Sequence, residues 1–116
     1  MNHREETLGI VYRFLMPSLK LKDRDNEGRS REESLHRYLL ERFGGYTATA
    51  ANIYGYWKDA RGADVYGEHK EYTVALKEPG LLPELKRFLA KQTREMREQS
   101  LYVEEGEEAR LLIPID

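Results

Sequence analysis

Hydrophobic and polar positions divide the chain into short segments, and the first of these has a period of two residues. Every second position from 8 to 16 carries a large apolar side chain, namely Leu8, Ile10, Tyr12, Phe14 and Met16. This period predicts a β-strand with one apolar face that ends at Pro17. Residues 20–28 hold few apolar side chains and many turn formers, so we expect a solvated, mobile loop there.

A helix is predicted after this loop, because its start, its apolar stripe and its end are all visible in the sequence. Ser30 and Glu33 form a capping box, in which each side chain pairs with a backbone N–H of the first helical turn. Apolar residues then recur at helical spacing at Leu35, Leu39 and Phe43. Gly44 and Gly45 supply a left-handed C-terminal cap, so the helix should end there.

The middle of the chain predicts two strands joined by a turn. Residues 46–57, which read YTATAANIYGYW, are rich in Thr and aromatic side chains, as is typical of strands. Residues 65–76 alternate with a period of two, which places Glu68 and Tyr72 on one face and His69 on the other. The turn KDARGAD between the two segments predicts a β-hairpin.

A second helix and a final strand complete the pattern. Two prolines and a glycine between residues 79 and 83 mark the boundary, and Pro83 suits the first position of a helix, where its missing N–H costs nothing. Side chains at three- and four-residue steps from Leu82 to Gln99 predict a helix of about five turns. The remaining segments are a last main strand, an acidic turn and an added edge strand, at residues 100–103, 105–108 and 110–115.

The order of these elements predicts an α+β fold of the ferredoxin-like β-α-β-β-α-β type, in which two helices pack on one face of an antiparallel sheet. Residues 110–115 can add an extra C-terminal edge strand. The chain of 116 residues has the size of one domain, so we expect residues 1–116 to form a single α+β domain. The second face of the sheet needs a cover, and the eight tyrosines favour a second subunit, so we expect a homodimer.

The composition narrows the classes of function. A formal net charge of −2 disfavours binding to nucleic acid or to an anionic membrane. The absence of cysteine excludes disulfides, thiolate nucleophiles and thiolate metal sites. No apolar stretch is long enough for a signal peptide or a membrane span, so a cytoplasmic protein is expected. Few Asn and Gln residues together with many Glu, Arg and Tyr resemble the composition of thermophile proteins.

Motifs for a metal or a cofactor are missing from the sequence. The histidines at positions 3, 36 and 69 show no metal-ligand spacing, so no metal site is expected. Gly44 and Gly45 follow a helix instead of opening one, and neither phosphate-binding glycine motif is present. We therefore expect no cofactor.

The predicted hairpin carries the candidate functional residues. Glu68 shares a strand face with apolar side chains, where its pKa could be raised and it could act as a general acid or base with Tyr66 or His69. The alternative is a strand-end Glu paired with a Lys or Arg. The aromatic candidates for a ligand or interface contact are Tyr54, Tyr56, Trp57 and Tyr72. Base stacking by these rings is disfavoured, because the basic and aromatic residues of RNA-recognition strands are missing.

Short motifs between residues 43 and 68 suggest a family resemblance. FGGYT, GYW and VYGEH resemble a pattern of small uncharacterised bacterial ferredoxin-like proteins. That pattern has Phe-Gly-Gly-x-Thr at a helix end, Gly-x-Trp before a turn, Tyr-x-x-Glu at the next strand and a Gln near the last strand. The corresponding residues here are Phe43, Gly44, Gly45, Thr47, Gly55, Trp57, Tyr66, Glu68 and Gln99, with Tyr66 and Glu68 two positions apart. The resemblance implies the fold and no particular activity.

Three functions follow from these observations. The first is a non-catalytic binding or interaction module, a homodimer that engages a small molecule or another protein. The second is a small dimeric enzyme of the α+β-barrel type, in which Glu68 with Tyr66 or His69 transfers protons. The third, nucleic-acid binding, is disfavoured by charge. A pocket around Glu68 would favour the enzyme, whereas a filled core and an exposed aromatic surface would favour the module. The sequence identifies no substrate, pathway or protein partner.

Overall fold

The computed structural model of the chain describes residues 2–115, and its strands form one antiparallel sheet. Its elements are β1 (Asn2–Pro17), η1 (Lys20–Lys22), α1 (Arg31–Phe43), β2 (Thr47–Ala48), β3 (Ile53–Lys58), β4 (Asp64–Leu76), α2 (Leu81–Glu95) and β5 (Val103–Ile115). The strand order is β2-β4-β1-β5, and β3 also pairs with β4. The α+β class with two helices and an antiparallel sheet is therefore confirmed. No helix among residues 2–115 is long and apolar enough to cross a membrane.

The chain divides into two compact units, and β1 and β4 each contribute residues to both. One unit holds residues 2–14 and 73–115, and the other holds residues 15–72. The helix α2 belongs to the first unit and α1 to the second. The placement of both helices on one face of the sheet, and the single domain over residues 1–116, stay predictions.

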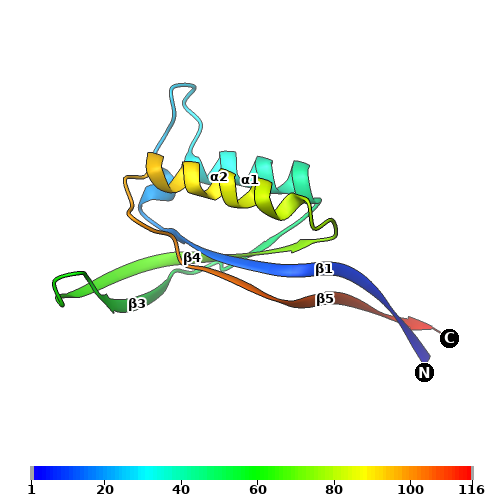
Figure 1. The fold of residues 1–116 in the computed structure, drawn as a ribbon. Coiled ribbons are helices and arrows are strands. Elements are labelled where there is room, and N and C mark those ends of the chain that lie inside the picture. Colours follow the sequence, from blue (N-terminus) through cyan, green and yellow to red (C-terminus); the bar gives the residue numbers. More distant parts are fainter. Residues whose placement is uncertain (1, 116) are drawn as a thin grey trace. The chain divides into compact units, whose positions relative to one another are not determined.

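In the first unit, α2 lies along one face of the strands (Figure 1). The apolar stripe predicted for this helix is buried, with Leu85 and Leu89 inside. The helix begins at Leu81 and ends at Glu95, before the predicted end at Gln99. It ends there because the backbone turns left-handed at residue 97. The strand side of the interior consists of Tyr12, Phe14, Val74 and Leu76.

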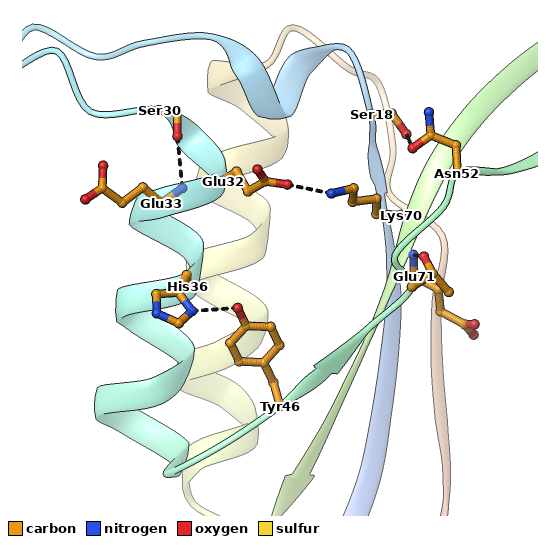
Figure 2. Close-up of polar contacts among 10 residues, drawn as sticks. Ser18, Ser30, Glu32, Glu33, His36, Tyr46, Asn52, Lys70 and Glu71 are labelled. Carbon is orange, nitrogen blue, oxygen red and sulfur yellow. Dashed lines mark hydrogen bonds and ion pairs between the residues drawn. The ribbon is translucent and has the colours of Figure 1, made fainter.

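In the second unit, α1 has the predicted ends. The Ser30 hydroxyl accepts a hydrogen bond from the Glu33 backbone N–H at 3.1 Å, and Gly44 is left-handed with φ 79°. Figure 2 shows this cap and the ion pair of 2.9 Å between Glu32 and Lys70, which joins α1 to β4. Leu35 and Leu39 are fully buried. The predicted loop 20–28 begins with the short helix η1, whose Leu21 is buried.

The predicted strand at residues 46–57 is interrupted, so the simple six-element ferredoxin-like order is not observed. Thr49 still exchanges hydrogen bonds with Glu71, but residues 50–52 leave the ladder before β3 begins at Ile53. Ala and Asn, which occupy these positions, are depleted from strands. Asn52 instead accepts a hydrogen bond from the Ser18 hydroxyl at 2.9 Å (Figure 2).

The prediction for the C-terminal segment is wrong. The acidic turn at 105–108 and the separate edge strand at 110–115 are parts of one strand, β5, which pairs with β1 from Phe14 back to Asn2. Cross-strand contacts order the acidic stretch, because Thr7 bonds to the Glu108 carboxylate and Arg110 pairs with Glu5 at 3.1 Å. The same pairing extends β1 to residue 2, well before its predicted start at residue 8.

Candidate functional site

Most of the residues selected from the sequence lie on the hairpin of β3 and β4. The two strands pair from Ile53 opposite His69 to Lys58 opposite Asp64. The Asp59 carboxylate closes the turn by accepting the backbone N–H groups of Arg61 and Ala63 at 2.8 and 2.9 Å. Aspartate stabilises turns in this way because its short side chain reaches the backbone two residues on. The predicted hairpin is therefore confirmed.

The tip of this hairpin is a two-stranded arm, which consists of β3, the turn after it and residues 64–67 of β4. The strand β1 ends at Pro17, and the next residue, Ser18, donates its backbone N–H to the Glu68 carbonyl at 3.0 Å. Beyond this bond the chain enters η1, so residues 64–67 have β3 as their one neighbouring strand in the described chain. Figure 1 shows the arm reaching past the end of β1. Side chains on the arm therefore lack cover from the rest of their unit.

One face of the arm carries a cluster of three tyrosines, Tyr54, Tyr56 and Tyr66. Tyr56 lies directly opposite Tyr66, and the ring centroids within the cluster are 5.2 to 6.4 Å apart. The rings nevertheless stay exposed, at 71%, 69% and 50%. Desolvation by the neighbouring rings, together with the negative charge of Glu68, raises the pKa of Tyr66 above its ordinary value. The cluster is an exposed aromatic surface that carries three hydroxyl groups.

The other face of the arm carries Trp57, whose ring covers Gly67. The indole lies beside His69, with ring centroids 6.0 Å apart. A Cβ atom at Gly67 would lie 2.6 Å from the indole and 2.8 Å from the imidazole, so glycine leaves the space that the ring needs. Trp57 is still 48% exposed. Both faces of the arm thus present large aromatic side chains to solvent.

The three residues proposed for acid–base chemistry lie on two different faces of β4. Glu68 is exposed and lies opposite Tyr54, while His69 lies on the other face of the strand. Tyr66 shares the face of Glu68 but is half-exposed. Among the described residues, these three line neither the hollow beside Leu89 nor the smaller hollow beside Gly9.

Tyr72 differs from the other aromatic candidates because it is buried. Its ring packs on that of Tyr46 with centroids 5.7 Å apart, and 3% of its surface is exposed. Burial, with a smaller contribution from the charge of Glu32, raises its pKa far above the ordinary value of tyrosine. The hydroxyl oxygen of Tyr46 in turn lies 2.6 Å from Nδ1 of His36 on α1 (Figure 2). Tyr72 therefore supports the interior of its unit and cannot be part of the exposed surface.

Two of the edge strands of the sheet, β5 and β3, differ in charge. The strand β5 pairs with β1 alone and carries five charged side chains, namely Glu104, Glu105, Glu107, Glu108 and Arg110. The strand β3 pairs with β4 alone, reads IYGYWK, and has one charge at its end. Charged side chains on an edge strand prevent pairing with another chain, whereas an uncharged edge permits it. The edge of β3 is therefore open to strand pairing and that of β5 is protected.

A hollow of about 650 Å³ lies in the first unit. The sequence analysis did not predict it. It is bounded by α2 from Lys86 onward, the segment after the helix, and one residue each of β1 and β5. Its apolar lining includes Leu89, Leu101 and Val103. Three cations and one carboxylate also line it, namely Lys86, Arg94, Arg97 and Glu98. A size between 300 and 1,000 Å³ and a mixed lining are typical of small-molecule sites.

The backbone at the end of α2 shapes this hollow. Arg97 is left-handed with φ 60°, and its N–H donates to the Arg94 carbonyl at 3.0 Å. The next N–H, of Glu98, reaches back to the Thr93 carbonyl at 3.1 Å. These two bonds form a Schellman cap, whose left-handed position is usually a glycine. A glycine at position 97 would have predicted the end of the helix, but the sequence has an arginine there. No other local sequence signal indicates the hollow.

Two further observations concern metal binding and related proteins. No group of three or more His, Cys, Asp or Glu residues among positions 2–115 could hold a metal ion. Comparison with protein-family models, curated proteins and solved structures finds no match for this chain. The resemblance to small ferredoxin-like proteins stays a prediction, and the function has to be argued from the arm and the hollow.

Proposed function

We propose that the protein is a non-catalytic binding module that assembles as a homodimer through the edge of β3. The observation that carries this proposal is the arm itself, an edge strand whose one charge lies at its end and whose two faces carry exposed aromatic rings. The exposed position of Glu68, away from the hollows beside Leu89 and Gly9, supports a binding role over the alternative of an acid–base enzyme.

A second copy of β3 fits this edge by symmetry. Two identical strands that pair antiparallel about a two-fold axis at Gly55 place each Tyr54 opposite the Tyr56 of the other copy. On the opposite face each Ile53 then meets Trp57 of the other copy. Like charges do not oppose one another, because Lys58 lies at the end of the strand and pairs with Asp64 at 2.6 Å.

The area available agrees with a weak dimer. Four exposed rings, those of Tyr54, Tyr56, Trp57 and Tyr66, could bury roughly 500 Å² per subunit at about 200 Å² for each full ring. About 1,000 Å² over both subunits lies at the lower end of specific interfaces. We therefore expect a dimer with a dissociation constant on the order of micromolar.

Sedimentation velocity of the wild-type chain and of two lysine variants tests this proposal. Tyr56→Lys introduces a charge at the centre of the edge and should give monomers at concentrations where the wild type is dimeric. Tyr102→Lys is the matched control, because Tyr102 is 60% exposed and lies outside every strand of the described chain. It should stay dimeric, and both variants should keep the wild-type far-ultraviolet circular dichroism. A monomeric wild type at hundreds of micromolar, or a dimeric Tyr56→Lys, would contradict the proposal.

A further inference from the structure

The hollow at the end of α2 has a charge opposite to that of the whole protein. The chain carries a formal net charge of −2, whereas three cations and one carboxylate line the hollow. Lys86 is engaged in an ion pair of 3.2 Å with Glu105. Within residues 2–115, the guanidinium groups of Arg94 and Arg97 form no ion pair or hydrogen bond. Two arginines that could each hold an anion in a bidentate manner therefore line this hollow.

The conformation of Arg97 indicates that its side chain has a role beyond ending the helix. A left-handed backbone is strained for any residue other than glycine, so glycine would cap α2 at lower cost. Arginine near a helix C-terminus also complements the helix dipole, but Arg94 in the last turn already supplies that charge. Strained residues outside regular structure are concentrated at functional sites.

The remaining walls suit the uncharged part of a ligand. Leu89, Leu101 and Val103 offer apolar contacts beside the two arginines. Tyr12, almost fully buried, lines the same hollow, and burial raises its pKa, so its hydroxyl stays protonated at neutral pH. It can donate a hydrogen bond to an oxygen of the ligand, or accept one.

We propose that this hollow binds a small organic anion, with its carboxylate or phosphate on Arg94 and Arg97 and its apolar body on Leu89, Leu101 and Val103. The site lies within one unit of one chain, so it does not depend on the dimer proposed above. The assignment adds a ligand class to a binding module whose subunit contact lies elsewhere.

Titrating the ¹⁵N-labelled protein with 4-phenylbutanoate and with the uncharged 4-phenylbutanamide, at matched ionic strength, tests this site. A probe of about twelve non-hydrogen atoms should bind with a dissociation constant of about 1–10 mM. The amide shifts should saturate and concentrate at Thr93, Arg97, Ser100 and Leu101, all of which line the hollow. The uncharged probe should bind about tenfold more weakly or worse, because it cannot form charge-assisted hydrogen bonds.

Three variants connect the binding to the arginines. Arg94→Ala should weaken 4-phenylbutanoate binding about tenfold, whereas Arg87→Ala, a matched charge loss on the exposed side of α2, should leave it unchanged. Arg97→Gly should weaken binding while keeping the fold, because glycine suits the left-handed position. Equal binding of the two probes, equal effects of the substitutions at 87 and 94, or the absence of saturable shifts up to about 50 mM would overturn the proposal.

Discussion

Gly9 is the position in this fold where a single methyl group should do the most damage. It pairs with Ala109 of β5 just after a register shift that follows Thr7, and its φ of +98° lies in a region that residues with side chains rarely adopt. A Cβ atom there would lie 2.0 Å from the Leu76 carbonyl oxygen and 2.8 Å from the Lys77 Cα. Both neighbours are backbone atoms, so no side-chain rotation can relieve the contact. Gly9→Ala must therefore displace β1 from β4 at this point.

The expected cost has two parts. An L-residue at positive φ costs roughly 1 to 2 kcal/mol, and forcing extra atoms into a packed region costs about 1 to 3 kcal/mol. Gly9→Ala should then lower the free energy of unfolding by about 2 to 5 kcal/mol. This is a large fraction of the 5 to 15 kcal/mol that is usual for a domain, so the variant could be partly unfolded at 37 °C.

Urea titration followed by far-ultraviolet circular dichroism measures this loss. Gly106→Ala is the control, because Gly106 lies in the partner strand β5 and its nearest atom would be 3.9 Å from the new methyl group. That substitution should change stability by less than about 0.5 kcal/mol. If Gly9→Ala and Gly106→Ala had the same unfolding midpoint, the close approach of β1 and β4 at Gly9 would be wrong.

Two further predictions concern the end of α2 and the buried tyrosine. Arg97→Gly should raise the free energy of unfolding by about 0.5 to 1 kcal/mol, because it relieves the left-handed strain, and a loss in urea titration would show that the arginine stabilises the cap. Tyr72 has a raised pKa in the folded protein, so its contribution to stability is complete below about pH 10 and falls as the pH rises above that value. The loss should reach about 1.4 kcal/mol per pH unit, because the unfolded chain then ionises while the folded protein keeps the proton. Tyr72→Phe should remove this part of the alkaline slope, and parallel urea midpoints for the variant and the wild type between pH 9 and pH 11 would contradict the assignment.

Elements with local signals could be predicted from the sequence. The helix α1 has its cap at Ser30 and its left-handed end at Gly44, and both lie within a turn of the residues that they serve. The hairpin of β3 and β4 is similar, because the Asp59 turn and the period of two in β4 are short-range features. The exposed aromatic residues of the arm could be selected because they lie on these two strands.

Elements ordered by distant partners could not be predicted in this way. The first residues of β1 show no alternation of apolar and polar side chains, and they form a strand because β5 pairs with them. The acidic stretch of β5 has the composition of a turn, yet Thr7 and Glu5 on β1 hold its Glu108 and Arg110 in place. Side chains that match across strands far apart in the sequence override the local preference.

The hollow at the end of α2 illustrates the same limit at a candidate site. A helix continuing to Gln99, as the apolar spacing predicts, would have carried Arg97 and Glu98 within its helical turns. The left-handed conformation at Arg97 instead ends the helix, and Leu101 and Val103 then line a hollow with Tyr12 of β1. The apolar spacing predicted too long a helix because it includes Met96. Met96 is buried, as the spacing predicts, but it is already the C-terminal cap of the helix. An apolar stripe records which side chains are buried, and it does not record where the backbone leaves the helix. The left-handed conformation of Arg97, which shapes the hollow, therefore has no signature in the hydrophobic pattern.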